Sequence, residues 1–148
     1  MFERIVAAVD LDPERSTKVV DAAQEIARAF NSNVLVAHVR ELERPPAMLA
    51  TTARPGATPP AMHVEGADEA RQLVDEGVRR LQAAGIVAQG QIGEGAGSTA
   101  RELLDIAQQH EANLIIVGDR QSRVTDLLLG GVANRIAHLA PCPVLVVR

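Results

Sequence analysis

The chain has very few aromatic side chains: two Phe and no Trp or Tyr among 148 residues. Its core must therefore be built from Val, Ile, Leu and Ala. The shortage also removes the stacking platforms on which the bases of single-stranded nucleic acids are often bound. The formal net charge is −4, so there is no basic excess to attract nucleic acid or an anionic membrane surface. These absences argue against both kinds of partner.

The sequence also lacks a second cysteine, a signal peptide and a membrane-spanning run. A single Cys cannot form an intramolecular disulfide, which suits a reducing cytosol, although an exported protein without disulfides would look the same. The first residues, 1–4, lead straight into a strand-like segment without the layout of a signal peptide. We therefore expect a cytoplasmic protein with one domain over residues 1–148.

Apolar, strand-like segments alternate with segments of helical periodicity. Five strands are predicted, at 5–9, 34–39, 86–92, 114–117 and 144–147. The first helix is expected to take Ser16 as its N-cap. The third would begin at Ser98 or Thr99, with Glu102 closing a capping box with Thr99. The segment 86–92 alternates apolar with polar or small residues, which favours a strand at the edge of a sheet.

The regular pattern disappears between about residues 40 and 66. Pro45-Pro46, Pro55-Gly56 and Pro59-Pro60 interrupt a stretch of Ala, Thr and Met without periodicity. The stretch is too short for a domain and long for a connection, so the sequence predicts a flexible loop or lid.

Alternating strands and helices predict an α/β three-layer sandwich with a doubly wound, mainly parallel sheet. In such sheets the first strand is usually central, and a ligand crevice opens at its C-terminal end, where the strand order reverses. If the first and fourth strands are neighbours, Asp10 and Gly118 meet at that crevice.

The most informative stretch begins at the fourth strand. Residues 114–117 end at Gly118-Asp119; after a polar loop and three leucines comes Gly130-Gly131, which opens an amphipathic helix. A glycine-bearing loop between a buried strand and a helix is a common way to hold a phosphate. Glycine lets the backbone approach the anion, and the helix N-terminus offers N–H groups.

Taken together and in order, these segments make the chain resemble the universal stress protein family over its whole length. The likeness lies in Ile5 to Asp10 with Ser16, Val34 to Val39, Gly97 to Ala100, Asn113 to Gly118, Leu127 to Gly130, and Ala140 to Val147.

ATP-binding members of that family carry the pattern Gly-x-x-Gly-x(9)-Gly-Ser/Thr. Gly118 matches the first glycine and Gly130 the later one, but the loop is one residue short and the middle glycine has no counterpart. Gly131 stands where the hydroxyl residue is expected. The missing hydroxyl removes a phosphate hydrogen bond of about 0.5–1.5 kcal/mol. Arg120 and Arg123 would supply compensating positive charge.

The resemblance implies a set of binding residues. Asp10 would lie against the adenine or ribose, the backbone of Val39 would meet the base edge, and Val132 and Ala133 would close the phosphate site. The strand ends around them complete the predicted cofactor-binding set: Ala8, Val9, Asp10, Val39, Val117, Gly118, Arg120, Arg123, Gly130, Gly131, Val132 and Ala133.

Several of these residues also have an alternative, purely structural role. Asp10 would serve as a loop or helix-capping carboxylate, the two arginines as solvated loop charges, and the glycine pair as a helix-start turn chosen for packing.

Other functional patterns receive little support. Asp10, Asp12 and Asp119 resemble the acidic pocket of a receiver domain, but the phospho-acceptor position after the third strand holds Gly93-Glu94-Gly95. The four His show no metal-ligand spacing, and we expect His38 to be hydrogen-bonded near a strand end. Cys142 reads as a buried, inert thiol. No nucleophile elbow or P-loop is present, so no catalytic or metal-binding residue is predicted.

We therefore predict strand order 3-2-1-4-5. As the resemblance implies, we also predict a homodimer in which the strands Val144–Val147 of two subunits meet antiparallel. The first functional hypothesis is a stress-response module that binds an adenine nucleotide, ATP with or without Mg²⁺, and acts through ligand-dependent interaction. The second is a member that has lost nucleotide binding and works as a dimeric interaction or protective protein. A slow ATPase is less favoured because no general base is evident.

Overall fold

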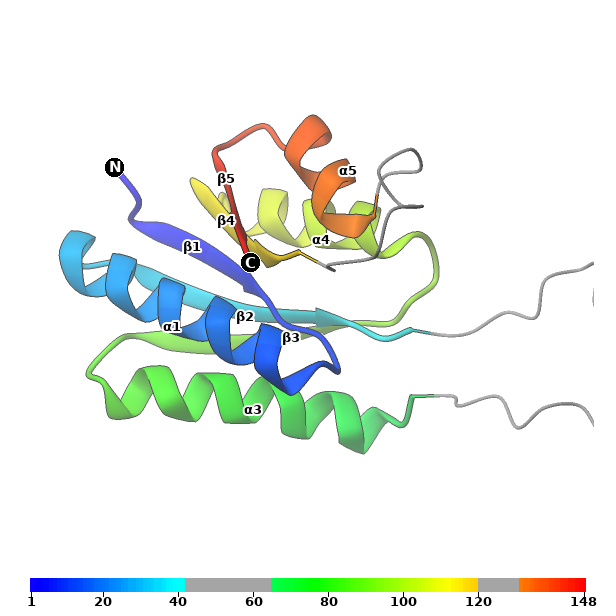
Figure 1. Ribbon diagram of the computed structural model, residues 1–148, viewed down its shortest axis with the longest axis horizontal. Coiled ribbons are helices and arrows are strands. Elements are labelled where there is room, and N and C mark those ends of the chain that lie inside the picture. Colours follow the sequence, from blue (N-terminus) through cyan, green and yellow to red (C-terminus); the bar gives the residue numbers. More distant parts are fainter. Residues whose placement is uncertain (42–64, 120–130) are drawn as a thin grey trace, which may run out of the picture.

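The computed structural model of the protein describes residues 1–41, 65–119 and 131–148. In these residues five strands alternate with four helices (Figure 1). Their order is β1 (Arg4–Ala8), α1 (Pro13–Phe30), β2 (Asn33–Val39), α3 (Ala67–Ala83), β3 (Ala88–Gly93), α4 (Thr99–Gln109), β4 (Leu114–Gly118), α5 (Val132–Leu139) and β5 (Val144–Val147). None of these helices is long and apolar enough to cross a membrane.

The sheet has the predicted topology. Its order is β3-β2-β1-β4-β5, and every neighbouring pair is parallel. The central strand β1 pairs with β2 on one side and with β4 on the other, with Ala8 opposite both Ala37 and Val117. The α/β class, the parallel sheet and the strand order are thus confirmed.

Helices cover both faces of the sheet, α1 and α3 on one side and α4 and α5 on the other (Figure 1). Alternate side chains of each strand therefore enter two different cores. In β1, Ile5 and Ala7 pack toward α1 and α3, while Val6 and Ala8 pack toward α4 and α5. Burial on both faces explains why the central strands are apolar almost throughout.

The first helix begins earlier than predicted. Its N-cap is Asp12, whose carboxylate Oδ1 accepts the Arg15 N–H at 3.0 Å, and Pro13 occupies the first helical position. The prediction of Ser16 as the cap was wrong, because Ser16 lies one turn inside the helix. Its hydroxyl instead donates to the Asp10 carbonyl at 2.6 Å and accepts the Asp10 N–H at 3.0 Å. An Asp-Pro pair is itself a helix-start signal.

The start of α4 also differs in part from the prediction. Ser98 is the N-cap and accepts the Arg101 N–H at 3.2 Å, so this alternative of the two is confirmed. The capping box between Thr99 and Glu102 is wrong. The Glu102 carboxylate instead accepts the N–H groups of Gly95 at 3.1 Å and Gly97 at 2.9 Å, and it thereby holds the β3–α4 turn.

The two edges of the sheet differ in composition. As predicted, β3 lies at one edge, although it spans Ala88–Gly93 rather than 86–92. It is rich in Gly and Gln. The other edge strand, β5, consists of three Val and one Leu, and the Leu145 side chain is exposed.

Candidate functional site

The ends of β1 and β4 form the centre of the candidate site. Ala8 lies opposite Val117 in the parallel register, so the residues that follow both strands emerge together at one edge of the sheet. Asp10 follows β1, and Gly118 is the last residue of β4. The register of β1 and β4 therefore brings Asp10 and Gly118 to the same edge of the sheet, as the strand order predicted. Ala8, Val9 and Val117 are buried beneath this edge.

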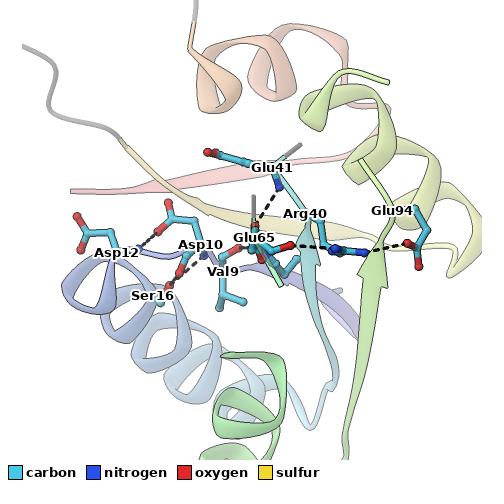
Figure 2. Close-up of polar contacts among 9 residues, drawn as sticks. Val9, Asp10, Asp12, Ser16, Arg40, Glu41, Glu65 and Glu94 are labelled. Atoms are coloured by element: carbon cyan, nitrogen blue, oxygen red, sulfur yellow. Dashed lines mark hydrogen bonds and ion pairs between the residues drawn. The ribbon is translucent and has the colours of Figure 1, made fainter. Parts of the chain in front are cut away.

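The Asp10 carboxylate is already engaged within the chain. Its Oδ1 accepts the Asp12 N–H at 2.9 Å, and its Oδ2 accepts the Arg15 Nε–H at 2.5 Å. The Asp10 backbone is bonded to Ser16, as Figure 2 shows. The loop-carboxylate role of Asp10 is therefore present in the structure, and a ligand hydroxyl would have to share or displace these bonds.

Arg15 joins the two strand ends. Besides Asp10, its guanidinium faces Asp12, with Nη1 3.4 Å from Oδ2. Burial lowers the pKa of Arg15, but the bond to Asp10 and the negative charges of Asp10, Asp12 and Glu41 outweigh it, so that the pKa lies above its ordinary value. Arg15 is thus a permanently charged group at the crevice.

The stem of Arg15 also explains Gly118. A Cβ at Gly118 would lie 2.3 Å from Arg15 Cγ and 2.7 Å from Cδ, closer than any real contact. Any other residue at this position would force the Arg15 side chain to shift, so packing against α1 calls for glycine here. This requirement is separate from any approach of a ligand, which the sequence pattern alone had suggested.

The β2 side of the site contains Val39 and His38. Val39 is buried and pairs with Gly93 of β3. His38 is hydrogen-bonded near the strand end, as predicted: its Nδ1 lies 2.9 Å from the Val9 carbonyl oxygen. Its Nε2 lies 2.5 Å from Oε1 of Glu65, a buried carboxylate just before α3.

The start of α5 supplies the other side. Gly131 is the N-cap, and among the described residues no side chain caps this helix end. The helix begins at Val132, which is half-buried, and Ala133 is buried beneath it. Gly131 has φ −54° and ψ 173°, which is extended backbone open to any residue. Arg120, Arg123 and Gly130 lie outside the described residues.

The arrangement offers binding chemistry. A helix N-terminus without a side-chain cap favours anions, and Arg15 adds positive charge beside the Asp10 carboxylate. Within residues 1–41, 65–119 and 131–148, no group of three His, Cys, Asp or Glu side chains could hold a metal ion.

Cys142 lies elsewhere, in the wall of a pocket of about 580 Å³ between α4 and the α5–β5 connection. It is half-buried rather than fully buried, and burial raises the pKa of its thiol. A raised pKa keeps the thiol protonated, which disfavours a nucleophile.

Sequence reasoning missed Arg15 and Glu65. Arg15 had a local signal: it is the third residue after Asp12, so a helix that starts at this Asp-Pro pair has Arg15 in its first turn, beside the N-cap. Glu65 had none, since its partner His38 is 27 residues away.

Comparisons with known proteins agree with this architecture. The chain matches the Universal stress protein family over residues 1–148. It is 31% identical over 156 residues to Universal stress protein YxiE of Bacillus subtilis, covering 100% of both chains. It is 32% identical over 146 residues to Universal stress protein A homolog 1 of Coxiella burnetii, covering 99% of this chain and 96% of that protein.

Solved structures share the fold. A universal stress protein from Archaeoglobus fulgidus superposes with a TM-score of 0.71 at 21% identity, covering 100% of this chain and 95% of the other. The same organism's protein in complex with dAMP gives 0.68 at 19% identity, with coverages of 100% and 98%. A universal stress protein in complex with cAMP gives 0.69 at 22% identity, with coverages of 99% and 97%.

Proposed function

Because the chain belongs to the Universal stress protein family, we propose that it is an adenine-nucleotide-binding module of the stress response. The observation that carries this proposal is the convergence of β1 and β4, which pairs Ala8 with Val117 and brings Asp10 and Gly118 to one edge of the sheet. Family relatives with this fold were solved with cAMP and dAMP. The module would act through ligand-dependent interaction and not through turnover.

In the proposed complex, Asp10 meets the ribose or adenine and the backbone of Val39 meets the base edge. Phosphate oxygens accept N–H groups at the start of α5, around Gly131, Val132 and Ala133. Arg15 offsets the charge of Asp10, which would otherwise repel a phosphate.

ATP, with or without Mg²⁺, is the fullest form of this proposal, and Arg120 and Arg123 would then assist the outer phosphates. AMP is the matched comparison because it has a single phosphate and needs fewer hydrogen-bond donors. It lacks the outer phosphates, for which the shortened loop and Gly131 provide the fewest donors.

A thermal-unfolding series tests the proposal. Ligand at a hundred times its dissociation constant should add about 2.7 kcal/mol to the free energy of unfolding, measured with Mg-ATP, ATP without Mg²⁺, AMP and cAMP. Mg-GTP is the control for base selectivity. If none of the adenine nucleotides raises Tm and none co-purifies, nucleotide binding is rejected.

One observation favours a second function. Both oxygens of the Asp10 carboxylate are bonded within the chain, and Arg15 already packs over Gly118. A crevice satisfied in this way suits a member that no longer binds nucleotide and works as a dimeric interaction or protective protein. A slow ATPase is a weaker candidate because no general base is evident among the described residues.

We further propose that the protein is a cytoplasmic homodimer joined through β5. This strand is an apolar edge, and the Leu145 side chain is 38% exposed while Val147 packs on the core beside α1. Leu145→Lys should therefore yield a monomer or an insoluble protein by analytical ultracentrifugation. Val87→Lys, at an exposed apolar residue beside the opposite edge, is the control. An unchanged dimer mass in Leu145→Lys rejects this interface.

A further inference from the structure

The end of β1 is held from the β2 side by a buried imidazole. His38 is 3% exposed, and its Nδ1 lies 2.9 Å from the Val9 carbonyl oxygen. A carbonyl oxygen only accepts hydrogen bonds, so Nδ1 must carry a proton. The Val9 N–H donates to the Ala37 carbonyl at 2.9 Å. Both polar backbone groups of Val9, the residue before Asp10, are therefore fixed by β2.

The other ring nitrogen faces a second acceptor. Nε2 lies 2.5 Å from Oε1 of Glu65, which is 1% exposed. An ionised carboxylate also only accepts, so a second proton must lie between Nε2 and Oε1. The pair is either imidazolium with carboxylate or imidazole with carboxylic acid. In both forms its net charge is zero, as burial demands.

The remaining groups of Glu65 tie this pair to its surroundings. Oε2 accepts the Glu41 N–H at 3.0 Å, and the Glu65 carbonyl accepts Arg40 Nη2–H at 2.9 Å. Arg40 also faces Glu94, at 3.4 Å from Nη1, as Figure 2 shows. The pair therefore links β1, β2 and the segment just before α3.

On the opposite flank, the Asp10 backbone is bonded to the Ser16 hydroxyl of α1. The backbone at the end of β1 is thus held by two side chains, Ser16 at Asp10 and His38 at Val9. The carboxylate that this backbone carries is itself bonded to the Asp12 N–H and to Arg15. Only His38 depends on a partner from a distant part of the chain.

We propose that His38 and Glu65 are positioning residues for the crevice: they share one proton and hold the β1 end so that Asp10 faces the ligand. This inference rests on the proposed nucleotide site and adds residues that do not touch the ligand. Glu65→Ala leaves Nε2 buried without a partner, which releases the ring from the Val9 carbonyl. Glu65→Gln keeps the shape, because an amide N–H donates to Nε2 and its oxygen still accepts from Glu41.

The test compares AMP affinity by calorimetry with NMR of the imidazole nitrogens. Glu65→Ala should raise the dissociation constant on the order of tenfold, while Glu65→Gln should stay within about threefold of the unaltered protein. In the unaltered protein both ring nitrogens should show protonated or proton-sharing shifts, and Glu65→Gln should show the neutral Nδ1–H tautomer. A merely structural role would lower Tm in Glu65→Ala but leave the AMP affinity of the folded protein unchanged. Glu94→Gln, which changes a nearby charge without touching the pair, should leave both measurements unaltered.

Two results would overturn the inference: AMP affinity unchanged in Glu65→Ala, or equally weakened in Glu65→Gln. If Glu65→Ala does not fold, Glu65→Asp replaces it, because it withdraws the carboxylate by one methylene. If the unaltered protein does not bind AMP, the affinities are measured with the adenine nucleotide that raises its Tm; if none does and none co-purifies, the nucleotide proposal fails by itself. Hydrogen exchange of the Asp10 amide then decides the positioning role. It should accelerate in Glu65→Ala and not in Glu65→Gln, and equal protection in all three proteins would reject the role.

Discussion

The two sides of the crevice differ in how far the chain satisfies its own polar groups. On the β1 side, both Asp10 carboxylate oxygens and the Asp10 backbone are bonded to Asp12, Arg15 and Ser16. On the α5 side, Gly131 provides no side-chain cap. Apart from Gly131 and its chain neighbours, no described residue has a heavy atom within 4 Å of the position that a Cβ on Gly131 would take. The polar groups on the β1 side are thus bonded without a ligand, whereas Gly131 has no side chain to cap the N–H groups on the α5 side.

This difference shows where binding energy can come from. Within the described residues, a phosphate at the start of α5 would break no side-chain cap bond of Gly131, whereas a ribose at Asp10 would exchange one set of bonds for another. We therefore expect the phosphate end to supply most of the net affinity and the β1 side to fix orientation.

The largest effect on stability is expected at Gly118, the last residue of β4, which packs against Arg15. Gly118→Val would drive its side chain into Arg15 and toward Val19, which lies 3.5 Å from the Cβ position. The free energy of unfolding should fall by about 1–3 kcal/mol in chemical denaturation. Gly97→Val is the control, since no atom lies within 4 Å there. If the loss is as large when Arg15 is first replaced by Ala, Arg15 is not what excludes a side chain at this position.

Removing the charge of Arg15 tests whether the assembled side helps or hinders an anion. Arg15→Gln leaves Asp10, Asp12 and Glu41 without the cation that they surround. AMP affinity should fall on the order of tenfold, or about 1.4 kcal/mol, by calorimetry. Arg79→Gln, which removes an exposed charge paired to Glu76, should change affinity less than twofold. Tighter binding in Arg15→Gln would mean that Arg15 blocks the crevice, as the second function requires.

The substitution Gly131→Ser tests phosphate binding on the α5 side. The backbone at Gly131 accepts any residue, so serine should cap α5 and donate its hydroxyl to a phosphate. We expect about two- to fivefold tighter binding, measured as a shift in the dissociation constant for Mg-ATP. Gly131→Ala is the matched control without a hydroxyl. Inserting a glycine after Arg120 as well restores the family pattern and should tighten binding further; equal affinities in all versions would place the phosphates elsewhere.

The smallest effect concerns Asp12 at the start of α1. The N–H bond from Arg15 lowers the pKa of Asp12 below its ordinary value of 3.8, against the opposing effect of desolvation. The charged form therefore stabilises the fold above that pH, and this contribution is lost as the pH falls through the lower, folded-state pKa. Asp12→Asn keeps the cap but not the charge, so Tm should fall less steeply on acidification. Identical acid profiles would show that the charge contributes nothing.

Much of the fold was readable from the sequence because it depends on local pattern. Apolar runs such as 114–117, the alternating segment 86–92 and the helical spacing between strands predicted the described strands and helices. Their order in the sheet followed from the usual arrangement of doubly wound folds, which the structure confirms. Helix starts were less certain, since Ser16 and Asp12 are both suitable N-cap residues within five positions; the structure selects Asp12, which Pro13 follows.

The strand order placed Asp10 and Gly118 at one edge, and the sequence already held the polar and glycine residues for it. The tertiary structure decided why residue 118 is glycine and which groups surround Asp10. Arg15 packs its stem over Gly118, far away in the chain, and bonds its guanidinium to Asp10. The His38–Glu65 pair was decided by the tertiary structure too. Hydrophobic periodicity reports burial of a face, whereas a polar contact across the chain depends on where two elements end in space.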